Sequence, residues 1–428
     1  MLDPKFIREN PAEVKRATRA KGLAPAIVDR FLKVDNTRRQ LIDRIEKIRA
    51  KKNQLKQDQV EEGKKLKNLL RRLEPDLRAV EEQFYQLAYE IPNLIAEDVP
   101  SGKDETENKV IKKWGKPEKF SFKARDHLEL GDFLGVIDTQ TAAKVSGSRF
   151  GYLKGDAVLL EFALVSYALS VLTDKKMISS LAAKISPDFP AKVFVPVVPP
   201  VMIRPEVYTQ MARLSPRDED ERYYLPKDDL YLVGSAEHTL GPMHLNQTIA
   251  AEAFPLRYLG FSTSFRREAG SYGKDTRGIL RVHQFDKLEM ESFSLPENSS
   301  LEQCFFVSIQ EYLMQALKIP YRVVAICTGD MGDPDYRQLD IEAWLPGQGK
   351  YRETHTSDLM LDYQSRRLGT KFKRKNGENG FVHMNDATAF AVGRTIIAIL
   401  ENFQQRDGSV LVPEVLRNYV GKDRIKRG

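Results

Sequence analysis

Cysteines and long apolar runs are scarce in this sequence of 428 residues. Its two cysteines, Cys304 and Cys327, are too few for a disulfide framework. No cysteine lies within 20 residues of His238, His244, His283, His355 or His383, so no zinc is expected. No apolar stretch approaches the roughly 20 residues that cross a bilayer, and the charged N-terminus is unlike a secretory signal. These absences favour a cytoplasmic protein of two or three domains with no membrane partner.

Glycine and proline are nearly absent from residues 31–91, where only Gly63 and Pro75 occur. Apolar residues recur there in steps of four and three: Leu66, Leu70, Leu73, Leu77, Val80, Phe84, Leu87 and Ile91. This spacing is typical of two helices packed as a coiled coil. With a polar turn at Gln57–Lys65, it predicts an antiparallel hairpin whose two arms are each about 45 Å long. Pro75 predicts a bend or a restart in the second arm.

Positive charge is concentrated in the same segment. Between Arg30 and Arg72 there are 15 Lys/Arg and 6 Asp/Glu, although the whole chain carries a formal charge of only +7. A basic surface of this kind attracts phosphate groups, which favours a nucleic-acid partner. A solvated helix face, or a coiled coil used for dimerisation, remains the alternative.

The composition changes after the hairpin. Residues 92–117 are rich in Pro, Gly and charged side chains, which is typical of a linker. Beyond them helical stretches and short β-type runs mix without regular alternation, which favours an α+β domain with a mostly antiparallel sheet flanked by helices. We therefore expect a helical domain at residues 1–100, with its hairpin at about 31–91, a linker at 101–117 and an α+β domain at 118–428.

The densest chemical signal is the segment 265–289, FRREAGSYGKDTRGILRVHQFDKLE. It places Arg266, Arg267, Arg277 and Arg281 around a Gly-rich loop between strand-like residues. Arginine offers a planar fork that matches phosphate oxygens, so four guanidinium groups this close together indicate anionic partners. An ordinary surface loop that solvates the same charges is the alternative.

The residue order in this segment resembles the motif 2 loop of class II aminoacyl-tRNA synthetases, in its seryl form. The matching parts are Arg266–Glu268, the loop Gly270–Gly278, and the returning His283–Glu289. Gly393–Gln404 resembles motif 3, and Pro199 and Pro200 stand where motif 1 has its dimer-contacting proline. Further matches extend from Met1 to about Arg417.

The resemblance implies a seryl-tRNA synthetase. Such an enzyme activates L-serine with ATP to seryl-adenylate and pyrophosphate, and then transfers serine to the 3′ end of tRNA(Ser), and of tRNA(Sec) where that is present. The resemblance also implies a homodimer, ATP with Mg²⁺, and tRNA binding by the helical arm. The implied tRNA-binding residues are Arg38, Arg44, Lys51, Lys52, Lys64 and Lys65.

The resemblance also assigns the reacting groups. Arg266 is expected to bind the α-phosphate, Arg394 the γ-phosphate and Glu353 the magnesium ion, and these three form the expected catalytic set. The expected ATP site is larger: Arg266, Arg267, Glu268, Glu353, Thr354, His355, Thr356 and Arg394. The expected serine site comprises Ser235, Ala236, Glu237, Arg266, Glu289 and Thr388.

Two acidic residues depart from the family pattern, because Asp358 and Asp386 stand where the family commonly has Asn. Extra carboxylates near the amino-acid pocket strengthen binding of an ammonium group but repel the α-carboxylate and the phosphates, and either effect remains open. Two other functions also remain: a ligase that loads a carrier protein, and a catalytically silent RNA-binding paralogue. The long hairpin argues against the carrier ligase, and retention of Arg266, Glu353 and Arg394 argues against the silent paralogue.

Overall fold

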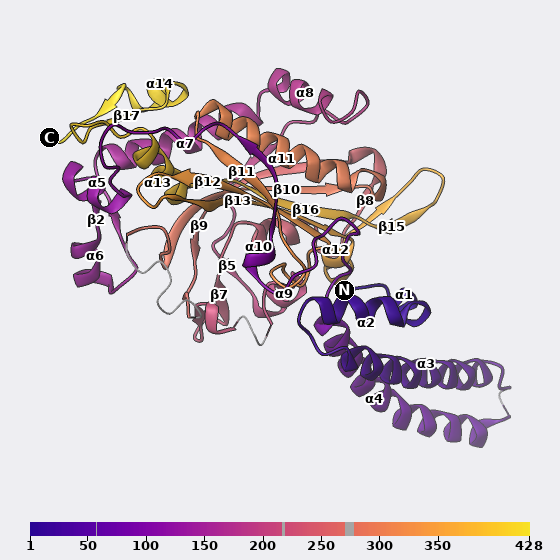
Figure 1. Cartoon of the computed structure of the whole chain (residues 1–428). Helices are drawn as coiled ribbons and strands as arrows, with labels where there is room; N and C mark the ends of the chain where they lie inside the picture. Colours follow the sequence, from indigo (N-terminus) through magenta and orange to yellow (C-terminus); the bar gives the residue numbers. More distant parts are fainter. Residues whose placement is uncertain (57, 216–218, 270–277) are drawn as a thin grey trace. The chain divides into compact units, whose positions relative to one another are not determined.

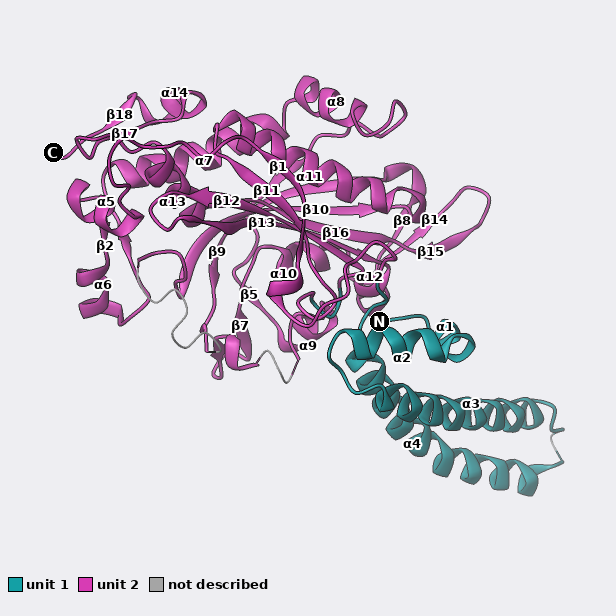
Figure 2. Ribbon diagram, in the orientation of Figure 1, with its two compact units in different colours: residues 1–95, 332–334 teal, residues 96–331, 335–428 magenta. Residues whose placement is uncertain are grey.

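The computed structural model describes residues 1–56, 58–215, 219–269 and 278–428. The chain forms two compact units (Figure 2). Unit 1 comprises residues 1–95 and 332–334, and unit 2 comprises 96–331 and 335–428. The division after residue 95 lies a few residues before the expected boundary at 100.

Unit 1 is helical, as the sequence predicted. Its helices are α1 (Pro4–Glu9), α2 (Pro11–Ala20), α3 (Ala26–Asn53) and α4 (Val60–Glu90). Ion pairs join the beginning of α3 to the end of α4, as in Arg38–Glu81, and the end of α3 to the beginning of α4, as in Lys51–Glu62. The hairpin is therefore antiparallel (Figure 1).

The hairpin seam matches the predicted heptads. Leu70 and Leu73 of α4 are buried against Ile45 and Ile48 of α3. The connection differs from the predicted turn, because α3 ends at Asn53 and α4 begins at Val60. Gly63 therefore lies inside the first turns of α4, where Glu61 and Glu62 favour the helix N-terminus. The helix continues through Pro75 without a restart.

Unit 2 is built on one large sheet. Among the described residues its strand order is β1-β11-β12-β13-β16-β10-β9-β4, and only the β4–β9 pair is parallel. The strands are β1 (Lys109–Trp114), β4 (Val195–Val197), β9 (Leu256–Phe265), β10 (Gln284–Ser294), β11 (Tyr321–Ala325), β12 (Arg337–Leu345), β13 (Lys350–Leu361) and β16 (His383–Ala391). The mostly antiparallel sheet confirms the predicted fold class. The segment expected to be a linker, 101–117, contributes β1 at one end of this sheet.

Helices cover both faces of the sheet (Figure 1). The apolar core packs α5 (His127–Leu134), α7 (Asp156–Leu172), α8 (Lys175–Ala183), α11 (Ser299–Ala316) and α13 (Val392–Asn402) around one face. The short helices α9 (Pro205–Gln210) and α10 (Glu237–Leu240) lie on the other face. By length and composition, the described residues contain no single helix able to cross a membrane; only the bent pair α7 and α8 passes that test together.

Candidate active site

A cavity of about 600 Å³ opens over the middle strands of the large sheet. Its lining residues come from β10, β13 and β16, from the ends of the β9–β10 hairpin, from the start of α13, and from the α9–α10 region. Gln338 of β12 and several residues between 142 and 161, including Glu161 of α7, also line it. This volume is in the range of small-ligand sites, and both polar and apolar groups line it.

Strand periodicity decides which side chains face the cavity. On β10, Leu288 and Met290 enter the apolar core, whereas Lys287 and Glu289 line the cavity. On β16, Ala387 and Ala389 enter the core, whereas Asp386 and Thr388 line the cavity. Successive side chains of a strand alternate between faces, so the sheet is apolar on one face and charged on the other.

One end of the cavity is suited to phosphate. The Arg266 side chain is held by its Nε, which donates to the Gly234 carbonyl at 3.1 Å, and its guanidinium lies 5.3 Å from the Phe285 ring centroid. Arg394 lies in the first turn of α13, with Nη1 3.0 Å from the Glu353 carboxylate. Arg281 pairs with Glu268 at 2.8 Å. These charges, together with the helix N-terminus, form an electropositive site with oxygen ligands beside it.

A β-bulge determines which β13 residues reach the cavity. Thr354 is an extra residue between the pairs Glu353↔Glu342 and His355↔Ile341. Glu353 and Thr356 therefore both line the cavity although they are three positions apart. Thr354 also lines it, whereas neither His355 nor Arg267 is among the described lining residues.

Those two residues of the expected ATP set lie elsewhere. His355 is buried, its ring centroid lies 5.9 Å from that of Phe390, and burial lowers its pKa to about 3. Arg267 is exposed. Gly270 to Arg277, most of the Gly-rich loop expected between Arg266–Glu268 and the returning strand, lie outside the described residues.

A chain of polar contacts connects four of the six expected serine-binding residues, Ser235, Glu237, Glu289 and Thr388, whereas Arg266 lies with the arginines described above. Thr388 Oγ1 donates to Glu289 Oε2 at 3.4 Å, and Lys287 Nζ lies 2.8 Å from the same oxygen. Lys287 also donates to Ser235 Oγ at 3.2 Å, and Ser235 Oγ donates to Glu237 Oε2 at 3.3 Å. Ala236 is buried beside Gly260, where a Cβ would lie 2.6 Å from Leu240 Cδ1 and 3.3 Å from Ala236 Cβ, so position 260 requires glycine.

His238 orients Glu237 from behind. Burial lowers the His238 pKa to about 3, so the imidazole is neutral. Its Nδ1 accepts from the Gly234 N–H at 3.0 Å, which leaves the proton on Nε2, 3.4 Å from Glu237 Oε1. The Tyr208 hydroxyl lies 2.8 Å from the same Nδ1. The histidine therefore acts as a fixed donor to Glu237.

The two serine-site glutamates have opposite electrostatic environments. Burial pushes the pKa of Glu237 upward, but Arg213, followed by His238 and Lys287, holds it well below the usual value. Burial raises the pKa of Glu289 to about 7, against the opposing effect of Lys287. Near neutral pH, Glu237 is a fixed carboxylate whereas Glu289 exchanges its proton.

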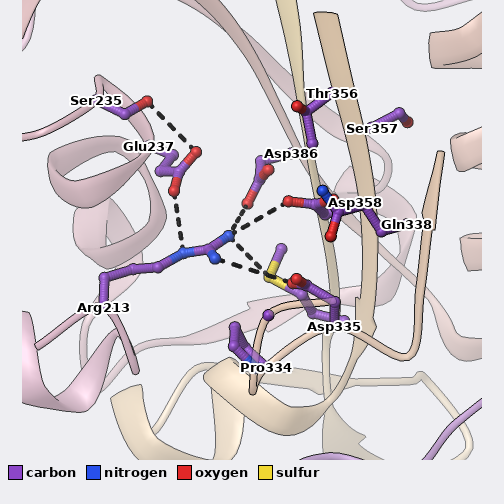
Figure 3. Close-up of polar contacts among 12 residues, drawn as sticks. Arg213, Ser235, Glu237, Pro334, Asp335, Gln338, Thr356, Ser357, Asp358 and Asp386 are labelled. Carbon is purple, nitrogen blue, oxygen red and sulfur yellow. Dashed lines mark hydrogen bonds and ion pairs between the residues drawn. The ribbon is translucent and has the colours of Figure 1, made fainter. Parts of the chain in front are cut away.

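Arg213 is shared among several carboxyl groups at this end of the cavity (Figure 3). Its Nη2 donates to Asp386 Oδ2 at 3.0 Å and lies 3.6 Å from Asp358 Oδ2. Its Nε lies 3.0 Å from Glu237 Oε1, and its Nη1 lies 3.9 Å from Asp335 Oδ1. The two acidic departures from the family pattern thus contact one buried guanidinium.

The sequence did not single out Arg213, Lys287 and Asp335, nor Glu291, a buried residue of β10 two positions beyond Glu289. Lys287 and Glu291 carried a signal, because charged and apolar residues alternate in DKLEMES within a central strand. Arg213 and Asp335 carried none, because each lies outside helices and strands and far along the chain from its partners.

The carboxyl groups of Glu237, Glu289 and Asp386 together have the composition of a cation site. Ligand atoms of Glu237, Glu289 and Asp386 lie within 4.8 Å of one another. Arg213 and Lys287 already supply positive charge beside these oxygens. An ammonium group is therefore a better match for the remaining carboxylate charge than a divalent ion, which would meet two fixed cations.

The arm residues expected to bind tRNA are not equivalent. Arg44, Lys51, Lys52, Lys64 and Lys65 are exposed, and Lys51 and Lys64 form surface ion pairs with Glu62 and Glu61. The Arg38 guanidinium lies 4.6 Å from the Phe84 ring centroid and 3.4 Å from Glu81. Arg38 therefore also packs within the hairpin.

Known proteins match the whole chain. Residues 1–95 match the family model of the seryl-tRNA synthetase N-terminal domain, and residues 221–403 match that of the class II tRNA synthetase core domain for G, H, P, S and T. The chain is 40% identical to the serine–tRNA ligase of Rubrobacter xylanophilus and 41% identical to that of Borreliella burgdorferi, with 99% of each chain covered. The crystal structure of seryl-tRNA synthetase from Pyrococcus horikoshii complexed with ATP is 36% identical, covers 100% of both chains and gives a TM-score of 0.89.

Proposed function

The chain belongs to the seryl-tRNA synthetase family, with that family's serine–tRNA ligase activity, and we propose that the cavity over β10, β13 and β16 is where the serine carboxylate attacks the α-phosphorus of ATP, giving seryl-adenylate and releasing pyrophosphate. The observation that carries this proposal is that two groups of side chains line the same cavity. Arg266 lies there with the ion pair of Arg394 and Glu353, and Glu237, Glu289 and Thr388 belong to one chain of polar contacts.

At the phosphate end the two arginines bind and orient ATP. Arg266 faces the α-phosphate, where negative charge builds up as the serine carboxylate attacks, and Arg394 holds the γ-phosphate. Positively charged donors fixed before the reaction stabilise this charge without reorganising. Glu353 fits Mg²⁺, because its half-exposed carboxylate is a hard oxygen ligand beside the phosphate site. The ion, when bound, neutralises phosphate charge.

At the amino-acid end the carboxylates select serine. Glu237 and Glu289 accept hydrogen bonds from the ammonium group, and Glu289 with Thr388 contacts the hydroxyl. An alanine in the same site would leave these buried polar groups unpaired, which is a large penalty. Lys287 does not compete for ATP, because Glu289 and Ser235 hold its ammonium.

Amino-acid-dependent ATP–pyrophosphate exchange, run with all twenty amino acids, tests this assignment. Serine alone should support rapid exchange. Glu237→Gln should abolish the serine-dependent exchange, whereas ATP binding, measured by equilibrium dialysis, should persist. Exchange with another amino acid, or loss of ATP binding together with serine binding, would contradict the assignment. Transfer to tRNA then distinguishes the enzyme from a carrier-protein ligase.

We propose that the arm binds tRNA. Arg44, Lys52 and Lys65 support this role. They are exposed and do not pack between the two helices, so their positive charges are accessible to tRNA phosphates. We also propose that the enzyme acts in the cytoplasm. The expected domain division also stays a proposal: an arm at 1–100, a linker at 101–117 and a catalytic domain at 118–428, with β1 of the linker pairing with the sheet of the catalytic domain.

A homodimer is proposed from apolar surface near the edge of the large sheet. Val195 and Val198 are 54% and 83% exposed next to Pro199, at the β4 edge of the large sheet. Exposed apolar side chains of this size are typical of an interface when they gather on one surface. Sedimentation at micromolar concentration should give a dimer, and a particle of 48.9 kDa would contradict it.

A further inference from the structure

Three adjacent strands place carboxyl groups in a row. Glu291 of β10 is the Cα partner of Asp386 of β16, and Asp386 is the partner of Asp358 of β13. All three residues are buried. Like charges opposite one another destabilise a sheet, so this row requires protons, a cation or both.

The structure provides the cation from outside the sheet. Arg213 follows Ala212, whose φ of +57° is in the left-handed region and redirects the chain after α9. The Arg213 carbonyl accepts a hydrogen bond from Arg222 Nη2 at 3.4 Å, which ties the backbone in place. Its side chain is 14% exposed and contacts Asp386 and Asp358. A backbone fixed in this way aims the guanidinium at the carboxyl row.

The same guanidinium is connected to the proposed serine site. Its Nε lies 3.0 Å from Glu237 Oε1, and Glu237 continues through Ser235 to Lys287 and Glu289. Glu291 completes the row without a hydrogen bond to Arg213: neither of its carboxyl oxygens has a hydrogen-bond partner among the residues that the structure describes. Burial raises the pKa of Glu291 well above the usual value, so it stays protonated and neutral.

We propose that Arg213 is the positioning residue of the serine site: it fixes Glu237 as an oriented carboxylate for the serine ammonium and holds the carboxyl groups of Asp386 and Asp358 in place beside it. The inference rests on the proposed function of the cavity. Arg213 acts on serine and not on ATP, because its ion pairs are with acidic residues at the amino-acid end.

The first test separates serine binding from ATP binding in pyrophosphate exchange. Arg213→Gln should raise the serine KM at least tenfold and change the ATP KM less than threefold. Arg213→Lys keeps the charge but loses the planar fork, so its serine KM should lie between that of the unaltered enzyme and that of Arg213→Gln. Arg322→Gln is the matched control, because Arg322 pairs with Glu342 on the same sheet away from the cavity lining. A serine KM within threefold of the unaltered enzyme, or equal increases in both KM values, would overturn the inference.

A second test uses rescue. Without Arg213, Asp358 is an uncompensated acid beside Asp386, so adding Asp358→Asn to Arg213→Gln should recover at least threefold in serine KM. The pH profile of kcat/KM for serine should move to higher pH in Arg213→Gln and return in the double variant, because the guanidinium favours the ionised carboxylates. No recovery and no movement of the profile would identify Arg213 as merely structural.

Folding is followed by circular dichroism in every variant. If Arg213→Gln does not fold, the double variant carries the test, and failure of both to fold would overturn a positioning role. The proposed function fails separately: in that case serine does not support exchange in the unaltered enzyme. If serine supports exchange and Arg213→Gln matches the unaltered enzyme, only this inference fails.

Discussion

The arm and the cavity both contain many charged side chains, but they hold them in opposite ways. In the arm, Arg49 and Glu74 form an ion pair with side chains 59% and 38% exposed, whereas Arg213 and Asp386 in the cavity are 14% and 2% exposed. Exposed pairs contribute at most about 1 kcal/mol and rearrange easily, so the arm suits a large, mobile polyanion. Buried pairs fix direction and proton affinity, so the cavity suits a small substrate.

The largest effect should follow the loss of a cavity arginine. Arg266→Ala or Arg394→Ala should lower the rate of pyrophosphate exchange about 10²–10³-fold, because each removes a donor fixed opposite developing phosphate charge. Thermal unfolding should change little, since both side chains lie at the cavity surface. Either variant retaining more than about a tenth of the exchange rate would remove that arginine from the catalytic set.

Removing the outer arm should separate the two half-reactions. Because Arg38 contacts Glu81, both helices can be cut beyond these residues and joined by a short Gly/Ser bridge in place of residues 41–78. Exchange should remain near normal, whereas aminoacylation should fall about a hundredfold as the phosphate contacts are lost. The deletion keeps the Phe31–Phe84 ring contact at the base of the hairpin.

A purely structural coiled coil gives a different result for the same deletion. Exchange and aminoacylation would then fall together, or neither would change. A second control keeps the full hairpin and substitutes Glu74→Gln and Glu81→Gln, which removes ion pairs with α3 but no positive charge. This variant should aminoacylate normally if positive charge is what tRNA meets.

The next effect is a pH dependence specific to serine. With ATP saturating, kcat/KM for serine should fall about tenfold per pH unit below about 7, because protonated Glu289 no longer accepts from serine. Glu289→Gln should lose this limb. Glu161 is the matched control: it also lines the cavity, and burial, with Asp286 beside it, raises its pKa to about 8. A limb that disappears in Glu161→Gln instead would reassign the ionisation.

Stability provides an independent check of the same group. The folded-state pKa of Glu289, about 7, is above its usual 4.5, so its contribution to stability is fully present below about 4.5 and is lost as pH rises through about 7. Serine bound to the ionised form offsets that loss. The increase in melting temperature caused by serine should therefore be larger at pH 8 than at pH 6, and an equal increase would argue against serine contacting Glu289.

The two regions also differ in how far the sequence predicts them. Heptad spacing is local, so it predicted the seam through Leu70 and Leu73, and it failed mainly at the turn. There Gly63 is tolerated within α4, because the favourable acidic first turn and seam packing outweigh its cost of about 1 kcal/mol. Local patterns predict local structure.

In the cavity, family motifs predicted the residues that β10, β13, β16 and α13 carry, but not those that packing adds. Because of the bulge at Thr354, Glu353 and Thr356 both face the cavity, while His355 between them enters the apolar core. Their closeness in the sequence motif did not predict this difference. Arg213 lies 173 positions from Asp386, and nothing local links them. A motif therefore predicts which strand carries the site residues, whereas strand register and contacts with distant residues determine which charged side chains face the cavity.

The smallest expected effect concerns single arm charges. Lys52→Ala and Lys65→Ala should each raise the KM for tRNA about two- to fivefold, and reduce the slope of log affinity against log salt by up to about one. Arg38→Ala should instead lower the free energy of unfolding by about 1 kcal/mol, because its guanidinium packs on Phe84 beside Glu81. Filter binding from 50 to 200 mM salt, with thermal unfolding in parallel, distinguishes the two kinds of residue. If Arg38→Ala changed the salt slope without lowering stability, or if Lys52→Ala lowered stability without changing the slope, the division between packing and phosphate-binding charges on the arm would be wrong.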